Sequence, residues 1–452
     1  MFESNRDYSL PVDGAGCGDE PSSSPVTTWI AELSSGQALK DVAADTDAGL
    51  INRLRVLEEL KAAAAAAQVR VAAAFDASVR AKDVRSGIPE EHQGRGVAAQ
   101  IALARRESPA RGGRILGFSK ALAHEMPCTL RALSEGRLNE WRATLLVRET
   151  ACLSVSDRRL VDREVAGDVA GLEGLGDGRL IGRIRKLTYR IDQEALVRRA
   201  AKAQVDRYVS CRPAPDTMTY LTGLLPVAQG VAVFAALSRE ADSLRARGDE
   251  RGRGQIMADT LVERITGLTQ ADRVPLEVQL VMTDRTLLAG AEEPAYLQGY
   301  GVVPAMWARD AVRKAGHEER TERTSRRGAP EAPDLWLRRL YTAPTSGELI
   351  GMDSKARFVP EALSRFISTR DQTCRTPWCN APIRHRDHIR PHRLGGRTSG
   401  DNLQGLCEAC NHAKEAAGWR AEGVDNPDRH TVRITTPTWH TYQSTAPPLP
   451  GT

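Results

Sequence analysis

Residues 374–419 decide the fold of the C-terminal part of the chain and read CRTPWCNAPIRHRDHIRPHRLGGRTSGDNLQGLCEACNHAKEAAGW. Cys374 and Cys379 are separated by four residues, and Cys407 and Cys410 by two. Two close cysteine pairs are typical of a tetrahedral structural zinc site with four thiolate ligands. A segment this short cannot bury enough apolar surface to fold alone, so a bound metal would hold it together. The alternatives are free thiols, or a zinc site in which a nearby histidine replaces one cysteine.

The other four cysteines have no partner at the spacing of metal ligands. They are Cys17, Cys128, Cys152 and Cys211. In a reducing cytoplasm such isolated cysteines are expected to be small buried residues or inert thiols. The predicted metal site therefore uses the C-terminal four alone.

A second group of chemistry-bearing residues lies between and beside the cysteine pairs. Asp387 and His388 are adjacent on a predicted strand, Asn402 follows the glycine-rich LGGRTSGD segment, and Asn411 comes directly after the last cysteine. Hydrolysis of a phosphodiester needs a general base for water, a divalent cation that stabilises the charged transition state, and a fixed geometry between them. These residue types can meet all three requirements.

The role of each residue follows from its chemistry. His388 is the candidate base, because an unperturbed imidazole titrates near neutral pH. Asp387 and the side-chain oxygen of Asn411 would bind a catalytic ion, and sparse oxygen coordination suits Mg²⁺ or Mn²⁺. Asn402 would orient the His388 imidazole by a hydrogen bond and fix its tautomer. Taken singly, these residues have simpler explanations, such as a helix cap for Asn411, so the prediction depends on their conjunction.

The distribution of charge favours a nucleic-acid partner. The chain has a formal charge of +5, and residues 365–420 contain ten Lys or Arg against five Asp or Glu. Phosphate neutralisation by such residues dominates non-specific DNA affinity, although a solvated arginine-rich surface would look the same. The candidate DNA-binding residues are Arg384, Arg386, Arg390, Arg393, Arg397 and Lys414.

The chain is too long for one ordinary core, and its composition changes divide it. The expected parts are a disordered N-terminus (1–28), a mainly helical domain (29–310), a flexible linker or excursion (311–334), a β-hairpin and connector (335–365), the cysteine-containing module (366–420) and a C-terminal tail (421–452). The fold class is therefore a mainly α N-terminal domain followed by a small α+β module stapled by zinc.

The helical domain is predicted from runs of good helix formers with helical periodicity. Helices are expected from near Trp29, over 47–80, 97–104, 115–125, 157–165, 193–209 and 226–245, and from Ala258. Residues 127–150 are expected to form two helices with a turn at Gly136 between them. In the long second helix the apolar face is expected to contain Leu50, Leu54, Leu57, Val71 and Phe75. Residues 275–283, PLEVQLVMT, read as a buried strand.

The sequence shows no sign of a membrane segment. No apolar run approaches the ~20 residues that span a bilayer. The first residues are acidic and rich in Gly, Pro and Ser, unlike a secretory signal. We therefore expect a cytoplasmic protein.

The C-terminal module resembles the HNH endonuclease family, also called ββα-metal or His-Me finger nucleases. The matching segments are CRTPWC, RDHIRPH, LGG, DNL, LCEAC and NHAKE, within about residues 370–415. The resemblance implies a ββα-metal fold, DNA as substrate, His388 as the base, Asp387 and Asn411 as metal ligands, and Asn402 as the orienting residue. The last residue of the family motif is often a histidine, so His412, beside Asn411, is the alternate metal ligand. An HNH endonuclease that hydrolyses DNA phosphodiester bonds is the expected function. The alternative is a zinc-containing DNA-binding protein with a weak or inactive nuclease site.

The upstream sequence is similar to the actinobacterial thirteen-E-twelve repeat family, in which a helical domain of unknown function (family 222) precedes an HNH module. The segments that carry this similarity are LQGYGVVPA, LRRLYTAPTSGELIGMD and RFVPEALSRFISTRDQTC. This part of the resemblance brings no catalytic residues. Two roles are open to the helical domain: positioning DNA, and assembly into a homo-oligomer.

Overall fold

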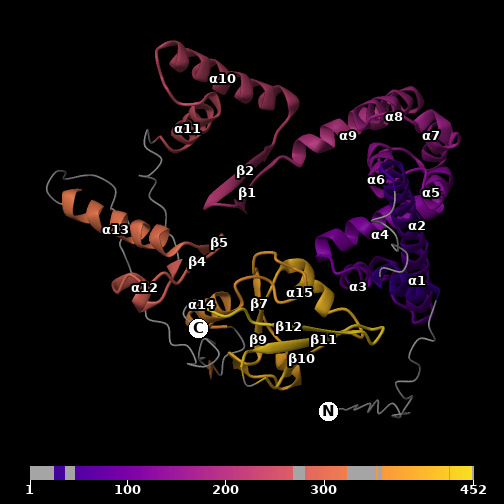
Figure 1. The fold of residues 1–452 in the computed structure, drawn as a ribbon. Helices are drawn as coiled ribbons and strands as arrows, with labels where there is room; N and C mark the ends of the chain where they lie inside the picture. Colours follow the sequence, from indigo (N-terminus) through magenta and orange to yellow (C-terminus); the bar gives the residue numbers. More distant parts are fainter. Residues whose placement is uncertain are drawn as a thin grey trace, which may run out of the picture.

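The computed structural model describes residues 25–35, 46–267, 280–322, 353–354, 359–426 and 428–449. Several predictions therefore lie outside the described residues. These are the N-terminus over 1–24, most of the strand over 275–283, the linker from residue 323 and most of the β-hairpin over 335–358. Figure 1 shows the described elements, with a helical domain first and a small α+β module last. The predicted fold class is confirmed.

The N-terminal part of the chain is helical, as predicted. Its helices are α1 (Pro25–Ser34), α2 (Asp47–Arg85), α3 (Val97–Ala104), α4 (Pro109–His124), α5 (Pro127–Ser134), α6 (Glu140–Glu149), α7 (Val155–Ala166), α8 (Asp177–Ile191) and α9 (Gln193–Val205). Helix α1 starts within the segment that was expected to be disordered up to residue 28. Side-chain caps begin several helices: Thr46 caps α2, Asn139 caps α6 and Ser154 caps α7.

The long helix α2 buries a face other than the one predicted. Leu54 and Val71 are exposed, at 63% and 69%. The buried face is made of small residues at helical spacing: Ala62, Ala65, Ala66, Val69, Ala72 and Ala73. Alanines let α4 and α5 pack closely against α2. The predicted face was wrong for Leu54 and Val71, whereas Phe75 is half-buried and packs beside Ala72 against Val97 and Ile101. The middle of the helix meets the other helices mainly through alanines.

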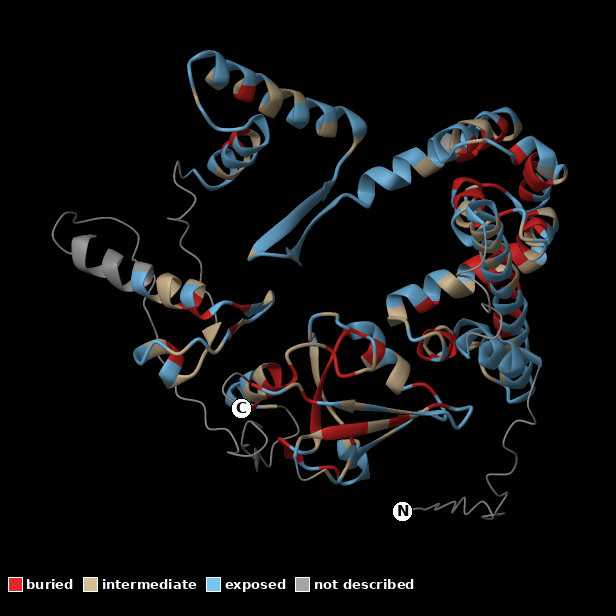
Figure 2. Cartoon of the chain, in the orientation of Figure 1, coloured by how far each residue is buried: buried red, intermediate tan, exposed pale blue. Residues whose placement is uncertain are grey.

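The core of the helical domain lies between α2 and α4–α8. Its largest fully buried side chains include Leu122, Met126, Leu146, Leu180 and Ile184. Figure 2 shows this concentration of buried residues in the helical domain. No helix in the described ranges is long and apolar enough to cross a membrane.

Beyond α9 the chain forms a hairpin where part of a helix was expected. Helix α9 ends at Val205, and strands β1 (Tyr208–Ala214) and β2 (Met218–Leu224) pair antiparallel. Almost every residue of both strands is exposed, as Figure 2 shows, so the hairpin has no apolar alternation that would reveal it. Helices α10 (Val227–Ala246) and α11 (Arg253–Thr266) then pack on each other.

A small sheet and helix follow. Strands β3 (Leu280–Val281), β4 (Ala295–Leu297) and β5 (Gly301–Val303) form an antiparallel sheet, with α12 (Asp284–Leu288) between β3 and β4. Strand β3 is the described end of the strand predicted over 275–283. Helix α13 (Ala305–Glu322) continues through the first half of the predicted linker, so the linker boundary at residue 311 was wrong.

The C-terminal module contains helix α14 (Glu361–Asp371), the antiparallel pair β7 (His385–His388) and β9 (Leu403–Leu406), and helix α15 (Glu408–Lys414). The short strands β6 (Asp353–Ser354) and β8 (Thr398–Ser399) form a second pair. The predicted tail is folded: β10 (Arg420–Val424), β11 (Thr431–Thr435) and β12 (Thr441–Thr445) form an antiparallel sheet. Val432 and Ile434 of this sheet pack against Ile389, the residue after β7. The segment predicted as a C-terminal tail over 421–452 therefore contributes a sheet that packs on the module.

The helical domain contacts the C-terminal module through α3 and α4 (Figure 1). The Thr438 hydroxyl donates a 3.0 Å hydrogen bond to the side-chain oxygen of Gln100, which is buried. Gly96 has a φ of +84°, and a Cβ there would lie 2.7 Å from the indole nitrogen of Trp419. Glycine therefore allows both the left-handed backbone and the close approach of the two parts.

We expect Leu146→Ala to destabilise the helical domain strongly. Leu146 has no exposed surface, and truncating a buried leucine costs about 2–5 kcal/mol in the free energy of unfolding. Leu160→Ala is the matched control, because Leu160 is 45% exposed and should change stability by less than about 1 kcal/mol. Urea denaturation of both variants measures the difference. Equal destabilisation by the two substitutions would contradict a core centred on Leu146 and its neighbours.

Candidate metal centre and nuclease site

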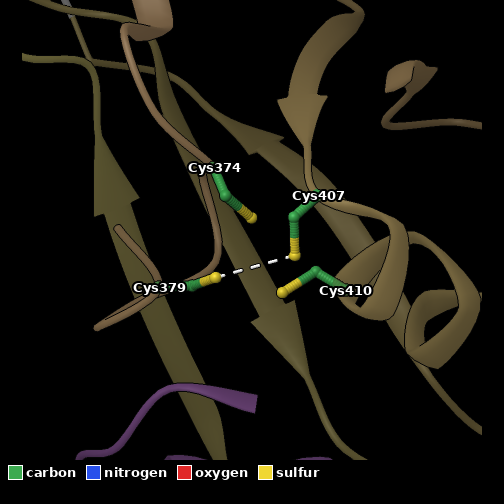
Figure 3. Close-up of side chains that lie close together, drawn as sticks. All are labelled: Cys374, Cys379, Cys407 and Cys410. Atoms are coloured by element: carbon green, nitrogen blue, oxygen red, sulfur yellow. Dashed lines mark hydrogen bonds between the residues drawn. The ribbon is translucent and has the colours of Figure 1, made fainter. Parts of the chain in front are cut away.

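The four C-terminal cysteines converge in the structure, as Figure 3 shows. All four are buried, and their sulfur atoms lie within 4.8 Å of one another. The Sγ atoms of Cys379 and Cys407 are 3.7 Å apart. Thiolates around one tetrahedral zinc ion would be about 3.8 Å apart, given a Zn–S distance of about 2.3 Å. The cluster therefore has the dimensions of a single four-thiolate site.

Local backbone structure brings the two pairs together. Cys374 and Cys379 lie on a turn before β7, in which the amide of Cys379 donates to the carbonyl of Thr376 and the amide of Cys374 to that of Ala381. Cys407 directly follows β9 and is the N-cap of α15, the helix that carries Cys410. The pairing of β7 with β9 therefore sets the distance between the two halves of the cluster.

The crowded thiols alter one another's acidity. Hydrogen bonding from the Cys379 thiol lowers the pKa of Cys374 to about 7, and hydrogen bonding from Cys374 lowers the pKa of Cys407. Thiolates are the form that binds metal. Hydrogen bonding with Cys374 raises the pKa of both Cys379 and Cys410, so without a cation only two of the four thiols are favoured as thiolates.

A buried ion pair on α14 holds the backbone of β9 and of the residues just before it. Arg370 and Asp371 are almost fully buried and form an ion pair with an N–O distance of 2.7 Å. Arg370 donates to the carbonyls of Gly400 and Leu403, and Asp371 accepts the amide of Gly405 at 2.7 Å. A buried ion pair is stabilising only when its remaining polar atoms are satisfied, as they are here by the β9 backbone.

His388 lies at the end of β7, and its ring is held by a residue that the sequence did not indicate. The Nε2 atom is 2.9 Å from the hydroxyl oxygen of Thr398, a buried residue of β8. The ring of His392 packs edge-on against it at 5.7 Å. Thr398 carries no distinguishing chemistry, so only the pairing of β8 with β6 could have indicated its place.

Asn402 does not make its predicted hydrogen bond to the imidazole. Its amide oxygen accepts the backbone N–H of Arg390 at 2.9 Å, and its Nδ2 donates to the carbonyls of Arg390 and Arg397. The loop passes so close that a Cβ on Gly396 would lie 1.9 Å from the Arg390 carbonyl. Asn402 therefore holds the glycine-rich loop and acts on His388 only through the backbone that follows it.

Asp387 and Asn411 face the same region from a strand and a helix. Helix α15 packs on β7, and the Lys414 ammonium group on α15 forms an ion pair with Asp387 Oδ2 and donates to the His388 carbonyl at 2.5 Å. Asn411 precedes Lys414 by three residues and so lies on the same helix face. The Oδ1 atom of Asn411 is buried and accepts no hydrogen bond from any residue that the structure describes.

His412 points elsewhere. It is exposed, and its ring centroid lies 6.5 Å from that of His385, at the opposite end of β7 from His388. Of the two candidate ligands on α15, Asn411 is therefore the one with a buried oxygen on the Asp387 side.

Of the residues predicted to contact phosphates, four have exposed side chains and two have partners within the module. Arg384, Arg390, Arg393 and Arg397 are exposed. Arg386 is half-buried and donates to the Ser368 hydroxyl of α14 at 2.6 Å. Lys414, only 11% exposed, lies against Asp387 instead of facing solvent. In this structure Arg386 and Lys414 thus have partners within the module.

We expect close to one zinc ion per chain, and its loss in Cys407→Ser. Because zinc binding supplies folding free energy to such a module, the variant should also lose the cooperative unfolding of the C-terminal part. Cys211→Ser is the control, since Cys211 is exposed on β1. Metal analysis after dialysis checks both. Unchanged zinc in Cys407→Ser would contradict the four-cysteine assignment.

A second expectation concerns the pH dependence of module stability, through His430, the residue before β11. Burial lowers the pKa of His430 to about 4, aided by the charge of Arg370, whereas an unfolded histidine titrates near 6.5. Between these values the unfolded chain binds the extra proton, so module stability should fall as pH drops from about 6.5 towards 4. His430→Gln should remove this component, and His92→Gln, in an exposed turn, should not. Urea midpoints across this range test it, and an unchanged pH dependence in His430→Gln would refute it.

Comparison with known proteins gives the chain its family. The model of the domain of unknown function DUF222 matches residues 54–329, and that of the HNH endonuclease matches residues 374–417. "Uncharacterized protein Rv3776" of Mycobacterium tuberculosis is 34% identical over 115 residues, which is 22% of this chain and 22% of that protein, so the chain spans about a fifth of the relative's length. No solved structure matches. The HNH domain supports a nuclease-type function, and the chain belongs to the DUF222 family with an HNH endonuclease domain behind the helical one.

Proposed function

We propose that the protein is a metal-dependent endonuclease that hydrolyses DNA phosphodiester bonds at the C-terminal module. One observation carries this proposal: α15 packs on β7, and Lys414 of α15 contacts both Asp387 and the His388 carbonyl, so the helix face that also bears Asn411 lies against Asp387 and His388. The HNH domain match covers the same residues. A module that only bound zinc would have no need for this arrangement.

His388 is proposed as the general base. Its contact with the buried Thr398 hydroxyl limits rotation of the ring, and its backbone carbonyl is held by Lys414. A fixed imidazole can accept the proton of an attacking water without first being ordered, which reduces the barrier. Thr398 and Asn402 are positioning residues in this proposal, because they act through the ring or the loop.

Asp387 and Asn411 are proposed to hold a catalytic Mg²⁺ or Mn²⁺. Both offer oxygen atoms, the donors that these hard cations prefer. The buried Asn411 Oδ1 accepts no hydrogen bond within the described part of the chain, and Asp387 Oδ2 has no hydrogen bond of good geometry beside its ion pair with Lys414. An unsatisfied buried oxygen is costly unless a ligand satisfies it. When bound, the ion would supply positive charge to the transition state.

The cysteine cluster is proposed to bind structural zinc. The four thiols are complete as a tetrahedral set, which leaves no open position for substrate. Its role is to fix the start of α15 against the end of β9. The exposed Arg384, Arg390, Arg393 and Arg397 would contact DNA phosphates beside the site.

A second candidate function is a zinc-containing DNA-binding protein with a silent nuclease site. The ion pair of Lys414 with Asp387 favours it, because the ammonium group lies where a divalent cation would have to bind. In the first candidate Lys414 moves aside or stays near a phosphate when the ion binds. The two functions differ in one measurable property, which is metal-dependent cleavage.

We expect the zinc-loaded protein to nick supercoiled plasmid DNA in Mg²⁺ or Mn²⁺. His388→Ala should reduce the nicking rate by about 10²–10⁴-fold, the usual contribution of a general base, while DNA binding is kept. His92→Ala is the matched control, an exposed histidine of the helical domain.

Two results would decide against the first candidate. Equal nicking by wild type and His388→Ala would assign the activity to a contaminant. Binding without nicking in any divalent metal, on duplex, branched or single-stranded DNA, would favour the silent-site candidate.

A further inference from the structure

Helix α8 of the helical domain carries a row of basic residues along one side. The helix buries Leu180, Ile184 and Leu187, which lie at i, i+4 and i+7. Four basic residues lie at i, i+4, i+7 and i+11 along one flank of this buried stripe: Arg179, Arg183, Lys186 and Arg190. Residues at these spacings share one face, so they form one row, which we call the α8 cationic row.

The charge of this helix is not neutralised from within. Helix α8 contains five Arg or Lys residues and one acidic residue, Asp177, at its first position. Asp177 accepts the Trp141 indole N–H at 2.8 Å and lies 3.8 Å from Arg142, so it is used by α6. The row therefore has no acidic residue at helical spacing.

On other surface helices of the protein, arginines pair with glutamates of the same helix. Arg55 pairs with Glu59 on α2, Arg198 with Glu194 on α9, and Arg365 with Glu361 on α14, each at a spacing of four residues. On α8 the same spacing places Arg179 beside Arg183 and Lys186 beside Arg190. Like charges at this spacing destabilise a helix, so an anionic partner would relieve the repulsion.

Neighbouring helices neutralise the row only in part. Arg183 donates to the carbonyls of Gly171 and Glu164, and Arg190 lies 3.7 Å from Glu164 while remaining 70% exposed. Arg179 and Lys186 are exposed and form no ion pair with any residue in the described ranges. Two charges of the row are therefore fully available and a third is largely so.

A shallow depression on the surface includes two residues of the row, Lys186 and Arg190, together with Tyr189 and Arg185. Arg185 is paired with the buried Glu149 at 2.9 Å, so Tyr189 is the group that the depression adds. Tyr189 is 53% exposed, and a phenol can donate a hydrogen bond to a phosphate oxygen. The row from Arg179 to Arg190 is about 16 Å long at 1.5 Å per residue, enough to follow several successive phosphates of one DNA strand.

We propose that the α8 cationic row is a second DNA-binding surface, which holds the phosphate backbone of duplex DNA without reading its sequence. Figure 1 shows α8 at the far end of the helical domain from the C-terminal module, whereas α3 and α4 lie beside that module. The row would therefore contact DNA away from the bond that is cut. This inference assigns a ligand to the helical domain and does not depend on cleavage by the module.

The test is DNA binding by the full zinc-loaded chain carrying His388→Ala, which keeps the DNA intact. Fluorescence anisotropy with a labelled duplex is measured over a salt series, with and without Arg179→Gln, Lys186→Gln and Arg190→Gln. We expect the triple variant to bind on the order of tenfold more weakly, and the slope of log K against log salt to fall by about one for each phosphate that is no longer neutralised. The reduction should be equal for duplexes of unrelated sequence, because interactions with the backbone carry no sequence information.

Two further variants separate position from total charge. Arg239→Gln, Arg245→Gln and Arg264→Gln remove the same charge from exposed sites on α10 and α11, and should leave affinity near that of the parent. Arg179→Lys with Arg190→Lys keeps the charge and should bind like the parent, so a weak triple variant cannot be explained by the positions alone. Circular dichroism checks that α8 remains folded.

Several outcomes would overturn the proposal. These are no DNA binding by the parent, equal weakening in the two triple variants, and weaker binding of the row variant to anionic lipid vesicles with DNA affinity unchanged. A reduced helical signal together with weak binding by the charge-keeping variant would also count against it. If the wild-type chain cuts no DNA but binds DNA through the row, the result would contradict the proposed nuclease function and support this inference.

Discussion

The convergence of four sulfur atoms is the constraint on which the C-terminal module depends. Cys407 is at once a cluster member, the residue after β9 and the N-cap of α15. Fixing its sulfur relative to Cys374 and Cys379 therefore fixes the direction in which α15 leaves the sheet. That direction decides which side chains of α15 contact β7. One of them is Lys414, which lies one helical turn after Cys410. In the proposed function, a zinc ion that serves only the fold would thus determine the geometry of the catalytic residues.

A second constraint comes from the buried Arg370 and Asp371. Every polar atom of such a pair must be satisfied, and the β9 backbone provides the partners. Arg375, four residues on from Asp371, extends this network to the backbone carbonyls of His430 and Ser444 in the C-terminal sheet. The sheet β10–β12 is therefore a structural part of the module, although it lies beyond the residues that match the HNH model.

The sequence predicted what depends on local chemistry. Cysteine spacing predicted the cluster, and the order of Asp387, His388 and Asn411 predicted residues that do come from adjoining elements. It could not predict Thr398, because a hydroxyl near a glycine-rich loop is usual in any turn, and its role arises from the path of the chain that brings β8 to the His388 ring. The amide of Asn402 could equally bond to a ring or to a backbone, and only the path of the loop decides between them. The alanine face of α2 was missed because burial there depends on how closely other helices approach.

The attachment of the helical domain bears on how the whole chain could work. Gln100 and Gly96, at the start of α3, meet Thr438 and Trp419 across the junction, so the module is seated on the helical domain by specific contacts. If both proposed surfaces bind DNA, they would reinforce each other, because binding at the first raises the effective concentration of DNA at the second. The four exposed arginines of the module would then need to supply less of the total affinity. Under that arrangement cleavage would be limited to DNA long enough to reach from α8 to the module, a property that the module alone could not have.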